Sequence, residues 1–301
     1  MKSMEGRVVL ITGAARGIGA ELARSLADRG ARLALLDVDG EEVARVASAL
    51  GGDAMSAAAD VTDYAALAAA VEAAVARFGG LDVAVANAGT ATLGTVRSID
   101  PAIWERNVEI NLHGVWRTAR AALPYLIARR GYLINIASVA SVVPFPGASS
   151  YAASKAAVEA FSNSLRLEVS HLGVDVGVAY FSFISTPLVR GFEERAAFRR
   201  LRAAAPPMLR ETYPVELAAA ALVRGIESRA RRVVAPGWVR WLLLLRGLLS
   251  NSVAERGLAR AAPEVVHLAD GGDPESALLP EAYARRLFGV AASSAETRDR
   301  R

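Results

Sequence analysis

A glycine-rich turn near the start of the chain constrains the possible fold more than any other feature. The apolar run over residues 7–11 predicts a β-strand, the next segment predicts a helix that ends at Gly30, and residues 32–38 predict a second strand. Between the first strand and the helix, three glycines are spaced Gly-x-x-x-Gly-x-Gly, at Gly13, Gly17 and Gly19. Glycine lets the backbone approach a pyrophosphate closely, and a helix N-terminus offers N–H groups and a positive dipole. This unit therefore predicts a dinucleotide-binding fold.

The second predicted strand ends with Asp37, which bears on the choice of dinucleotide. A carboxylate at this place accepts hydrogen bonds from the adenosine ribose hydroxyls of NAD and repels the 2′-phosphate of NADP. Arg16, in the glycine turn, favours NADP instead, because an arginine can pair with that phosphate. Arg16 can equally rest on the adenine or in solvent. A fixed like charge beside a phosphate is costly, whereas an unpaired surface arginine costs little, so we expect NAD.

The rest of the chain alternates between strands and helices. Further strands are predicted over residues 54–60, 81–86, 132–137, 175–181 and 232–235, and helices over residues 64–78, 101–130 and 151–172. Apolar strands separated by helices predict an α/β fold, a single Rossmann-type doubly wound parallel sheet of about seven strands with helices on both faces. We expect residues 1–237 to form a dinucleotide-binding catalytic domain with a lid at about 188–213, and residues 238–301 to form a C-terminal helical extension and tail.

Lys155 stands out, because the chain has 35 Lys and Arg residues and only Lys2 and Lys155 are lysines. Lys155 follows Tyr151 by four residues, so in a helix both side chains face the same side. The ordinary pKa of a tyrosine hydroxyl is about 10, and a nearby ammonium group lowers it. Lysine also provides a compact charge with an adjustable pKa, which arginine does not. The pair therefore indicates proton transfer to or from a hydroxyl group.

These motifs together resemble the short-chain dehydrogenase/reductase family over about residues 5–235. The shared marks are Thr12-Gly13-x-x-x-Gly17-x-Gly19, Asp60-Val61, Asn87-Ala88-Gly89, Asn111, Ser138 and Tyr151-Ala152-Ala153-Ser154-Lys155. The resemblance implies that the catalytic residues are Asn111, Ser138, Tyr151 and Lys155. The resemblance implies contacts between a nicotinamide dinucleotide and Gly13, Arg16, Gly17, Ile18, Gly19, Asp37, Asp60, Val61, Asn87, Ala88, Gly89, Tyr151, Lys155, Ile184 and Thr186.

Each catalytic candidate has a distinct expected role. Tyr151 is the general acid/base, and Lys155 lowers its pKa and can hold the nicotinamide ribose. Ser138 can hydrogen-bond the substrate oxygen, and its structural alternative is a strand-end cap. Asn111 resembles the residue that positions a water behind the lysine, and its alternative is a helix bend stabilised by its amide.

The sequence departs from the family after the strand predicted over residues 175–181. The family usually has Pro-Gly there, whereas this chain has Phe181-Ser182. We expect a substrate pocket lined by Ser138, Val142, Phe145, Tyr151, Phe181 and Phe183, with Phe192 and Phe198 of the lid at its border. Core packing is the alternative for any single phenylalanine, but together they favour a bulky apolar substrate.

Composition limits the remaining classes of function. The 301 residues are 53% hydrophobic and carry a net charge of +4 and no cysteine, so a globular protein without disulfides or thiolate chemistry is expected. The first residues lack the features of a signal peptide, and we expect a cytoplasmic location. Scattered arginines argue against nucleic-acid binding, and the three histidines share no metal-binding spacing, so no metal site is expected.

Two regions leave alternatives open. The arginines of the lid fit an acidic substrate tail or a CoA phosphate, although a solvated helix face is the more usual reason for such a run. Residues 238–249 predict a helix rich in Trp and Leu, which suits a subunit contact, a cap over the substrate pocket or a peripheral membrane contact. We favour the contact or the cap, and we expect a homodimer or homotetramer.

Two classes of function fit these residues. The first is an NAD-dependent oxidoreductase that acts on the CH–OH group of a lipophilic secondary alcohol, or on the matching ketone, of a steroid- or terpenoid-like kind. The second is a non-catalytic dinucleotide-sensing or scaffold protein on the same fold. The intact set of proton-transfer groups favours the enzyme, because a sensor does not need them.

Overall fold

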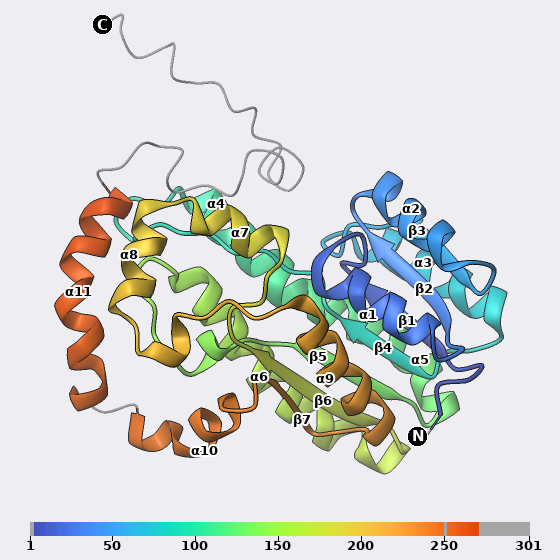
Figure 1. Cartoon of the computed structure of the whole chain (residues 1–301). Helices are drawn as coiled ribbons and strands as arrows, with labels where there is room; N and C mark the ends of the chain where they lie inside the picture. Colours follow the sequence, from blue (N-terminus) through green and yellow to red (C-terminus); the bar gives the residue numbers. More distant parts are fainter. Residues whose placement is uncertain (1–2, 250–251, 271–301) are drawn as a thin grey trace, which may run out of the picture.

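The computed structural model describes residues 3–249 and 252–270 and contains one parallel sheet of seven strands (Figure 1). The order across the sheet is β3-β2-β1-β4-β5-β6-β7. The strands are β1 Val8–Thr12, β2 Arg32–Asp37, β3 Ala54–Ala58, β4 Val83–Ala86, β5 Tyr132–Ile136, β6 Asp175–Phe181 and β7 Arg232–Ala235. Strands β2 and β3 are added on one side of β1, and β4 to β7 are added on the other side. In such sheets, ligands bind between the two sides, beyond the carboxyl ends of the strands. The predicted fold class is confirmed.

Helices cover both faces of the sheet (Figure 1). They are α1 Gly17–Ala27, α2 Gly40–Leu50, α3 Tyr64–Phe78, α4 Pro101–Val108, α5 Gly114–Arg129, α6 Ser149–Val169, α7 Pro187–Glu193, α8 Ala196–Ala204, α9 Val215–Ser228, α10 Val239–Leu249 and α11 Ser252–Asp270. Short 3-10 turns lie at Val139–Ser141, Ser170–Leu172 and Pro207–Leu209. Helix α2 was not expected from the sequence, although Asp39 caps its first turn by accepting a hydrogen bond from the N–H of Glu42.

The core has two halves because successive strand residues point to opposite faces. In β1, Val9 and Ile11 pack with α1, α2 and α9, whereas Val8 and Leu10 pack with α3, α5 and α6. All of β1 is buried, and each fully buried aliphatic side chain contributes roughly 1.5–3 kcal/mol. This two-sided packing holds the carboxyl end of β1, and the glycine turn that follows it, in a fixed position.

The helix predicted over residues 101–130 is interrupted by one π-helical turn, Glu109–His113. Asn111 lies in this turn and is fully buried. Its Oδ1 accepts a hydrogen bond from the N–H of Thr90, and its Nδ2 donates to the carbonyl of Thr90, both at 2.8 Å. The amide of Asn111 therefore ties the wide turn to the segment that follows β4.

The C-terminal extension packs along the lid side of the molecule. Helix α10 follows β7, and Leu242 packs with the cluster around Phe145 while Trp241, on the other face, is 64% exposed. Helix α11 lies beside α8 (Figure 1), where an ion pair joins Arg200 and Glu264 at 2.6 Å. Asp270 at its end binds Arg97. The expected roles of residues 238–249 as a pocket cap, a subunit contact or a membrane contact all stay predictions.

The boundary between a domain of residues 1–237 and an extension of residues 238–301 also stays a prediction, and residues 271–301 lie outside the described part of the chain. Among the described residues, no helix has the length and apolar character needed to cross a membrane.

Candidate functional site

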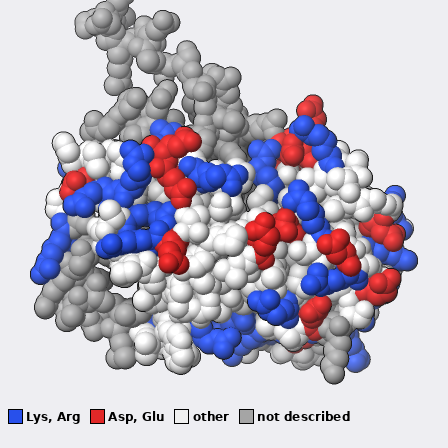
Figure 2. Space-filling model, viewed as in Figure 1, with Lys and Arg blue, Asp and Glu red and all other residues white. Residues whose placement is uncertain are grey.

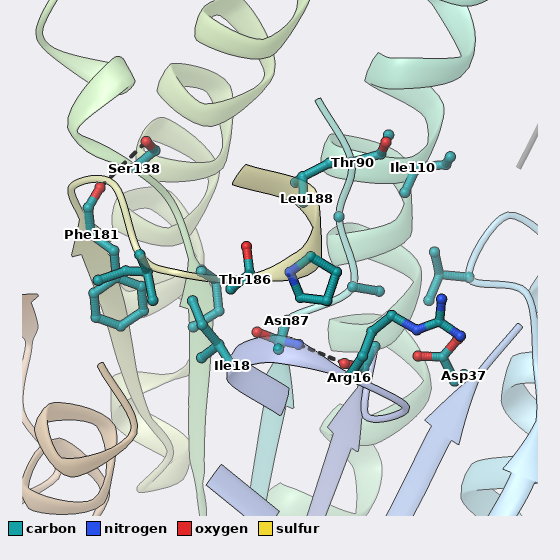
Figure 3. A pocket seen from close by; sticks show the side chains of 18 of the residues that line it. Arg16, Ile18, Asp37, Asn87, Thr90, Ile110, Ser138, Phe181, Thr186 and Leu188 are labelled. Atoms are coloured by element: carbon teal, nitrogen blue, oxygen red, sulfur yellow. Dashed lines mark hydrogen bonds between the residues drawn. The ribbon is translucent and has the colours of Figure 1, made fainter. Parts of the chain in front are cut away.

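A cavity of about 220 Å³ lies at the carboxyl ends of the strands (Figure 3). Arg16 and Asp37 lie at one end, and Ser138 and Phe181 lie at the other. Ile18, Asn87 and Thr186 lie between the two ends. The cavity is therefore an elongated site that reaches from the end of β2 to the ends of β5 and β6, and we refer to it as the first cavity.

The glycine turn forms one wall of the first cavity. Gly13 and Gly17 have φ angles of +67° and +57°, a region that favours glycine. A Cβ atom on Gly13 would lie 2.8 Å from the Cα of Ala88, so glycine is also required by the close approach of the two segments. Gly19 does not line the cavity. Its missing Cβ would lie 2.2 Å from the carbonyl oxygen of Gly13, so glycine lets α1 pack tightly under the turn.

The first turn of α1 faces the first cavity without a side-chain cap. Arg16 is the N-cap residue, it makes no capping hydrogen bond, and the turn contains no acidic residue. Helix N-terminal N–H groups without such partners form an anion site, and this arrangement fits the pyrophosphate of a dinucleotide.

Asn87 joins the end of β4 to the glycine turn. Its Nδ2 donates to the carbonyl oxygens of Thr12 and Gly13, both at 3.0 Å, and the Thr12 hydroxyl accepts from the N–H groups of Asn87 and Ala88, both at 3.1 Å. At Gly89, an added Cβ would lie 3.4 Å from the Nζ of Lys155. The small residues after Asn87 therefore keep the space beside Lys155 open.

Two carboxylates and an arginine meet at the β2 end of the first cavity. Asp37 Oδ2 accepts from the N–H of Ala15, and its Oδ1 accepts from the N–H of Asp39, both at 3.0 Å. Arg16 forms an ion pair with Asp39, whose side chain is only 7% exposed. The sequence left Arg16 with three possible environments, and the structure gives it a fourth, a neighbouring carboxylate.

Asp60 and Val61 line the same part of the first cavity. Burial acts to raise the pKa of Asp60, but hydrogen bonds from Thr62 and the nearby Arg106 guanidinium outweigh it, so the net pKa is lowered. Asp60 is therefore a carboxylate at neutral pH. It accepts from Thr62 N–H at 2.8 Å and from Arg106 at 2.9 Å.

The Tyr151 and Lys155 side chains project from α6 toward the far end of the first cavity. The Nζ of Lys155 lies 5.7 Å from the centre of the Tyr151 ring and donates to the carbonyl oxygen of Ile136 at 2.9 Å. Burial lowers the pKa of Lys155 to about 8. Burial also raises the pKa of Tyr151, and a hydrogen bond with Ser138 offsets part of this rise. The side chains of the protein alone therefore leave Tyr151 protonated at neutral pH.

Ser138 lies at the end of β5, and its hydroxyl faces Tyr151. The Oγ accepts from the N–H of Ala140 at 3.2 Å and donates to the carbonyl of Phe181 at 3.5 Å (Figure 3). The capping role that the sequence left open is thus present, since Ser138 caps the turn Val139–Ser141. The same hydroxyl nevertheless lines the first cavity, so the two roles are compatible.

Asn111 lies behind the first cavity and does not line it. Its Nδ2 also contacts Asn107 Oδ1 at 3.2 Å and the Ser154 hydroxyl at 3.1 Å. With both backbone groups of Thr90 bound as well, its amide holds the segment after β4 against α6. A proton relay through Asn111 stays a prediction.

A second cavity, of about 110 Å³, opens from the first on the lid side. It is mostly apolar, and its lining includes Leu93, Phe145, Phe183, Phe192, Phe198 and Leu201. Phe183 lies edge-on to Phe145 and to Phe198, with ring centres 6.1 and 5.5 Å apart. These rings form a rigid apolar wall, because edge-to-face contacts fix their relative orientation.

Two of the expected pocket residues lie elsewhere. Phe181 lines the first cavity and belongs to the core on the α1 side of the sheet. Val142 lines neither cavity and packs against a buried cluster that includes Val239 and Leu243 of α10. Ser138, Phe145, Tyr151 and Phe183 do line the second cavity.

Of the lid arginines, Arg199 and Arg202 bind other parts of the lid, whereas Arg200 pairs with Glu264 of α11. Figure 2 shows arginine side chains interspersed with acidic ones on the side that carries α8 in Figure 1. Arg199 donates to the carbonyls of Glu193 and Glu194. Arg202 binds Glu193 and Thr212, and its guanidinium lies 4.8 Å from the centre of the Phe183 ring. Arg202 therefore braces the aromatic wall, which sequence reasoning did not anticipate.

Several lining residues were missed at the sequence level: Val38, Asp39, Thr90, Ile110, Ala137, Ser182, Leu188 and Val189 in the first cavity, and Thr92, Leu93 and Leu201 in the second. Most of them lie next to a predicted motif in the sequence, and this closeness was the one signal that could have indicated them. In the described residues, no group of three or more His, Cys, Asp or Glu side chains is placed to hold a metal ion.

Comparison with known proteins agrees with this geometry. Residues 7–197 match the family model described as short chain dehydrogenase. The chain is 38% identical over 218 residues to a cis-4-hydroxycyclohexanecarboxylate dehydrogenase of Sinomonas cyclohexanicum, with 71% of this chain and 87% of the relative covered.

Two solved structures are similar. A 3-ketoacyl-(acyl-carrier-protein) reductase from Brucella melitensis complexed with NADH has a TM-score of 0.70 at 28% identity, with 77% of this chain and 98% of that chain covered. A short chain dehydrogenase/reductase from Burkholderia phymatum in complex with NAD has a TM-score of 0.71 at 26% identity, with 83% and 98% covered. The chain is therefore an oxidoreductase of the short-chain dehydrogenase/reductase family.

Proposed function

We propose that the protein transfers a hydride between NAD and a lipophilic secondary alcohol or its ketone, with Tyr151 as the general acid/base. The observation that carries this proposal is the meeting of the two cavities at Ser138 and Tyr151, which line both. An elongated cavity with the charged side chains of Arg16, Asp37 and Asp39 at one end thus opens at two hydroxyl groups into a smaller, mostly apolar cavity. Two similar solved structures contain NADH and NAD, which supports a nicotinamide dinucleotide as the cofactor of this protein.

NAD, when bound, supplies the nicotinamide ring that accepts or returns the hydride. Tyr151 Oη then takes the proton of the alcohol, or gives its own proton to the ketone oxygen. Ser138 Oγ donates a hydrogen bond to the same oxygen and stabilises the charge that develops there. Lys155, with a pKa lowered to about 8 by burial, is still mostly charged at pH 7 and favours the phenolate form of Tyr151.

The choice of NAD over NADP rests on the charges at the end of β2. Asp37 and Asp39 both line the first cavity there, and two carboxylates disfavour a 2′-phosphate. Arg16, which could otherwise attract that phosphate, forms an ion pair with Asp39. Both observations support NAD.

The class of substrate rests on the second cavity. Its wall of phenylalanine and leucine side chains favours an apolar ring or chain, and its size suits a compact ring better than a large polycyclic compound. The relative from Sinomonas cyclohexanicum is named for a substrate with a six-membered ring, which supports the same choice. We therefore narrow the steroid- or terpenoid-like expectation to monocyclic secondary alcohols.

A turnover screen tests the proposal. Purified protein is incubated with NAD⁺ and a panel of cyclic and linear secondary alcohols, and NADH formation is followed by absorbance. We expect turnover of cyclic apolar alcohols, and its abolition in Tyr151→Phe. Turnover of sugars or small polyols alone would contradict the apolar assignment. Binding of NADH without turnover of any alcohol or ketone would instead favour the dinucleotide-sensing alternative.

A further inference from the structure

Five residues line both cavities: Ser138, Tyr151, Ser182, Leu188 and Val189. They mark the boundary at which a molecule in the second cavity meets a dinucleotide in the first. Leu188 and Val189 are aliphatic, whereas the other three residues carry hydroxyl groups. The proposed chemistry uses two of these hydroxyls and leaves the third, that of Ser182, without a role.

Ser182 is held firmly but its hydroxyl is unsatisfied. Its N–H donates to the carbonyl of Ala235 at 3.1 Å, which extends the pairing of β6 with β7 by one residue. The residue is only 9% exposed, and its Oγ has no hydrogen-bond partner among the described residues. Burial of an unpaired hydroxyl is unfavourable, so a native structure normally pairs such a group or uses it to bind a ligand.

The other hydroxyls near the second cavity are already engaged. Thr92 Oγ1 pairs with Ser150 Oγ at 2.9 Å, and the proposed reaction already uses the hydroxyls of Ser138 and Tyr151. Two other buried hydroxyls in the described chain lack a partner, those of Thr90 and Ser141. Thr90 lines only the first cavity, and Ser141 lines neither.

We propose that the Ser182 hydroxyl binds a second oxygen of the substrate, carried on the carbon next to the reacting one. The preferred substrates are then ring alcohols and ketones with a vicinal hydroxyl or carbonyl group. This inference rests on the proposed function, since it assumes that the reacting carbon lies beside Ser138 and Tyr151. The apolar wall of the second cavity holds the rest of the ring, and Ser182 supplies the polar contact that fixes its orientation.

A pair of matched substrates tests this role. We compare 1,2-cyclohexanediol with 2-methylcyclohexanol, in which a methyl group replaces the second hydroxyl, using NAD⁺ and both the unmodified protein and Ser182→Ala. The ratio of kcat/KM for the diol to that for the methyl compound should fall about tenfold in Ser182→Ala, because one substrate hydrogen bond is lost. The KM for NAD⁺ should stay unchanged.

Ser141→Ala is the matched control, because it removes another buried, unpartnered hydroxyl that lines neither cavity. It should leave the ratio as it is. An unchanged ratio in Ser182→Ala would overturn the proposal. A rise in the KM for NAD⁺ that affects both alcohols equally would also overturn it, because the hydroxyl would then bind the nicotinamide amide.

A binding measurement separates this inference from the proposed function. If the unmodified protein oxidises neither alcohol, the proposed function fails, and thermal shifts of the protein saturated with NAD⁺ decide the role of Ser182. A larger rise in Tm with the diol in the unmodified protein than in Ser182→Ala supports the second-oxygen contact. Equal rises in the two proteins overturn it.

Discussion

Removal of the two carboxylates at the end of β2 should shift the enzyme from NAD toward NADP. A unit charge about 4 Å from a 2′-phosphate costs on the order of 1–4 kcal/mol, or roughly fivefold to several hundredfold in kcat/KM. Arg16 offsets part of this repulsion, although Asp39 already engages its charge. We therefore expect the unmodified protein to favour NAD by about five- to seventyfold, the lower half of that range.

Two substitutions separate the contributions. Asp37→Ser removes the charge nearest the expected ribose and should bring the two cofactors close to parity. Asp39→Asn keeps an oxygen that can cap α2 at Glu42 N–H but removes the ion pair with Arg16. The double variant leaves the Arg16 charge without either neighbouring carboxylate, and it should favour NADP by a few-fold.

Steady-state kcat/KM with NAD⁺ and NADP⁺ on one alcohol measures these preferences. Asp63→Asn is the control, because Asp63 caps α3 in the same way as Asp39 caps α2, and it does not line the first cavity. The control should retain the preference of the unmodified protein. If the unmodified protein uses NADP as well as NAD, or if the double variant keeps a full preference for NAD, the assignment of Asp37 and Asp39 to the ribose is wrong.

Tyr151→Phe should reduce turnover at least about 100-fold while NADH still binds, as followed by NADH fluorescence, and near-normal activity would contradict the mechanism. Lys155→Arg should also fail in the activity assay, because a planar guanidinium cannot replace the buried ammonium group. In a series of apolar alcohols, each added CH₂ should raise kcat/KM by up to about fourfold, which corresponds to about 0.8 kcal/mol, until the second cavity is full. A kcat/KM that falls as carbon is added would argue against an apolar site. The free energy of unfolding should depend on pH through Lys155, whose pKa is about 8 when folded and 10.5 in its ordinary state. Between these two pH values the unfolded chain binds more protons than the folded one, so the free energy of unfolding should rise by about 2 kcal/mol from pH 7 to pH 10 relative to that of Lys155→Met. Urea unfolding of both proteins measures this difference. The same pH dependence in both proteins would refute a buried charge at Lys155.

The sequence predicts elements best where both ends carry a clear signal. Helix α3 spans Tyr64–Phe78 as expected, because Asp63 caps its start and Gly79 takes a left-handed conformation after its end. The sequence left open a helix bend at Asn111, but the local pattern did not predict the π turn at Glu109–His113. Its cause is tertiary, namely the hydrogen bonds between Asn111 and Thr90.

In the candidate site too, some features could be predicted from the sequence and others depend on tertiary contacts. The glycine turn, Asp37 and Tyr151 line one cavity. This grouping could be predicted from the spacing of the motifs, because parallel strands place their carboxyl ends at the same edge of the sheet. The ion pair between Arg16 and Asp39 joins residues 23 positions apart, and it depends on how the α1 and α2 turns approach each other. Spacing along the chain does not contain that information.

The elements that carry the expected chemistry differ from those that shape the second cavity. Tyr151 and Lys155 lie on α6, a helix of 21 residues packed against the sheet, and Ser138 lies at the end of β5. Most of the aromatic wall, by contrast, belongs to residues 183–201, which lie outside the sheet and are braced mainly by Arg202. Changes in that outer segment can alter which alcohol is accepted while the proton-transfer groups stay in place. The fold thus keeps the reaction and the range of substrates on separate parts of the chain, so that one can diverge in evolution without the other.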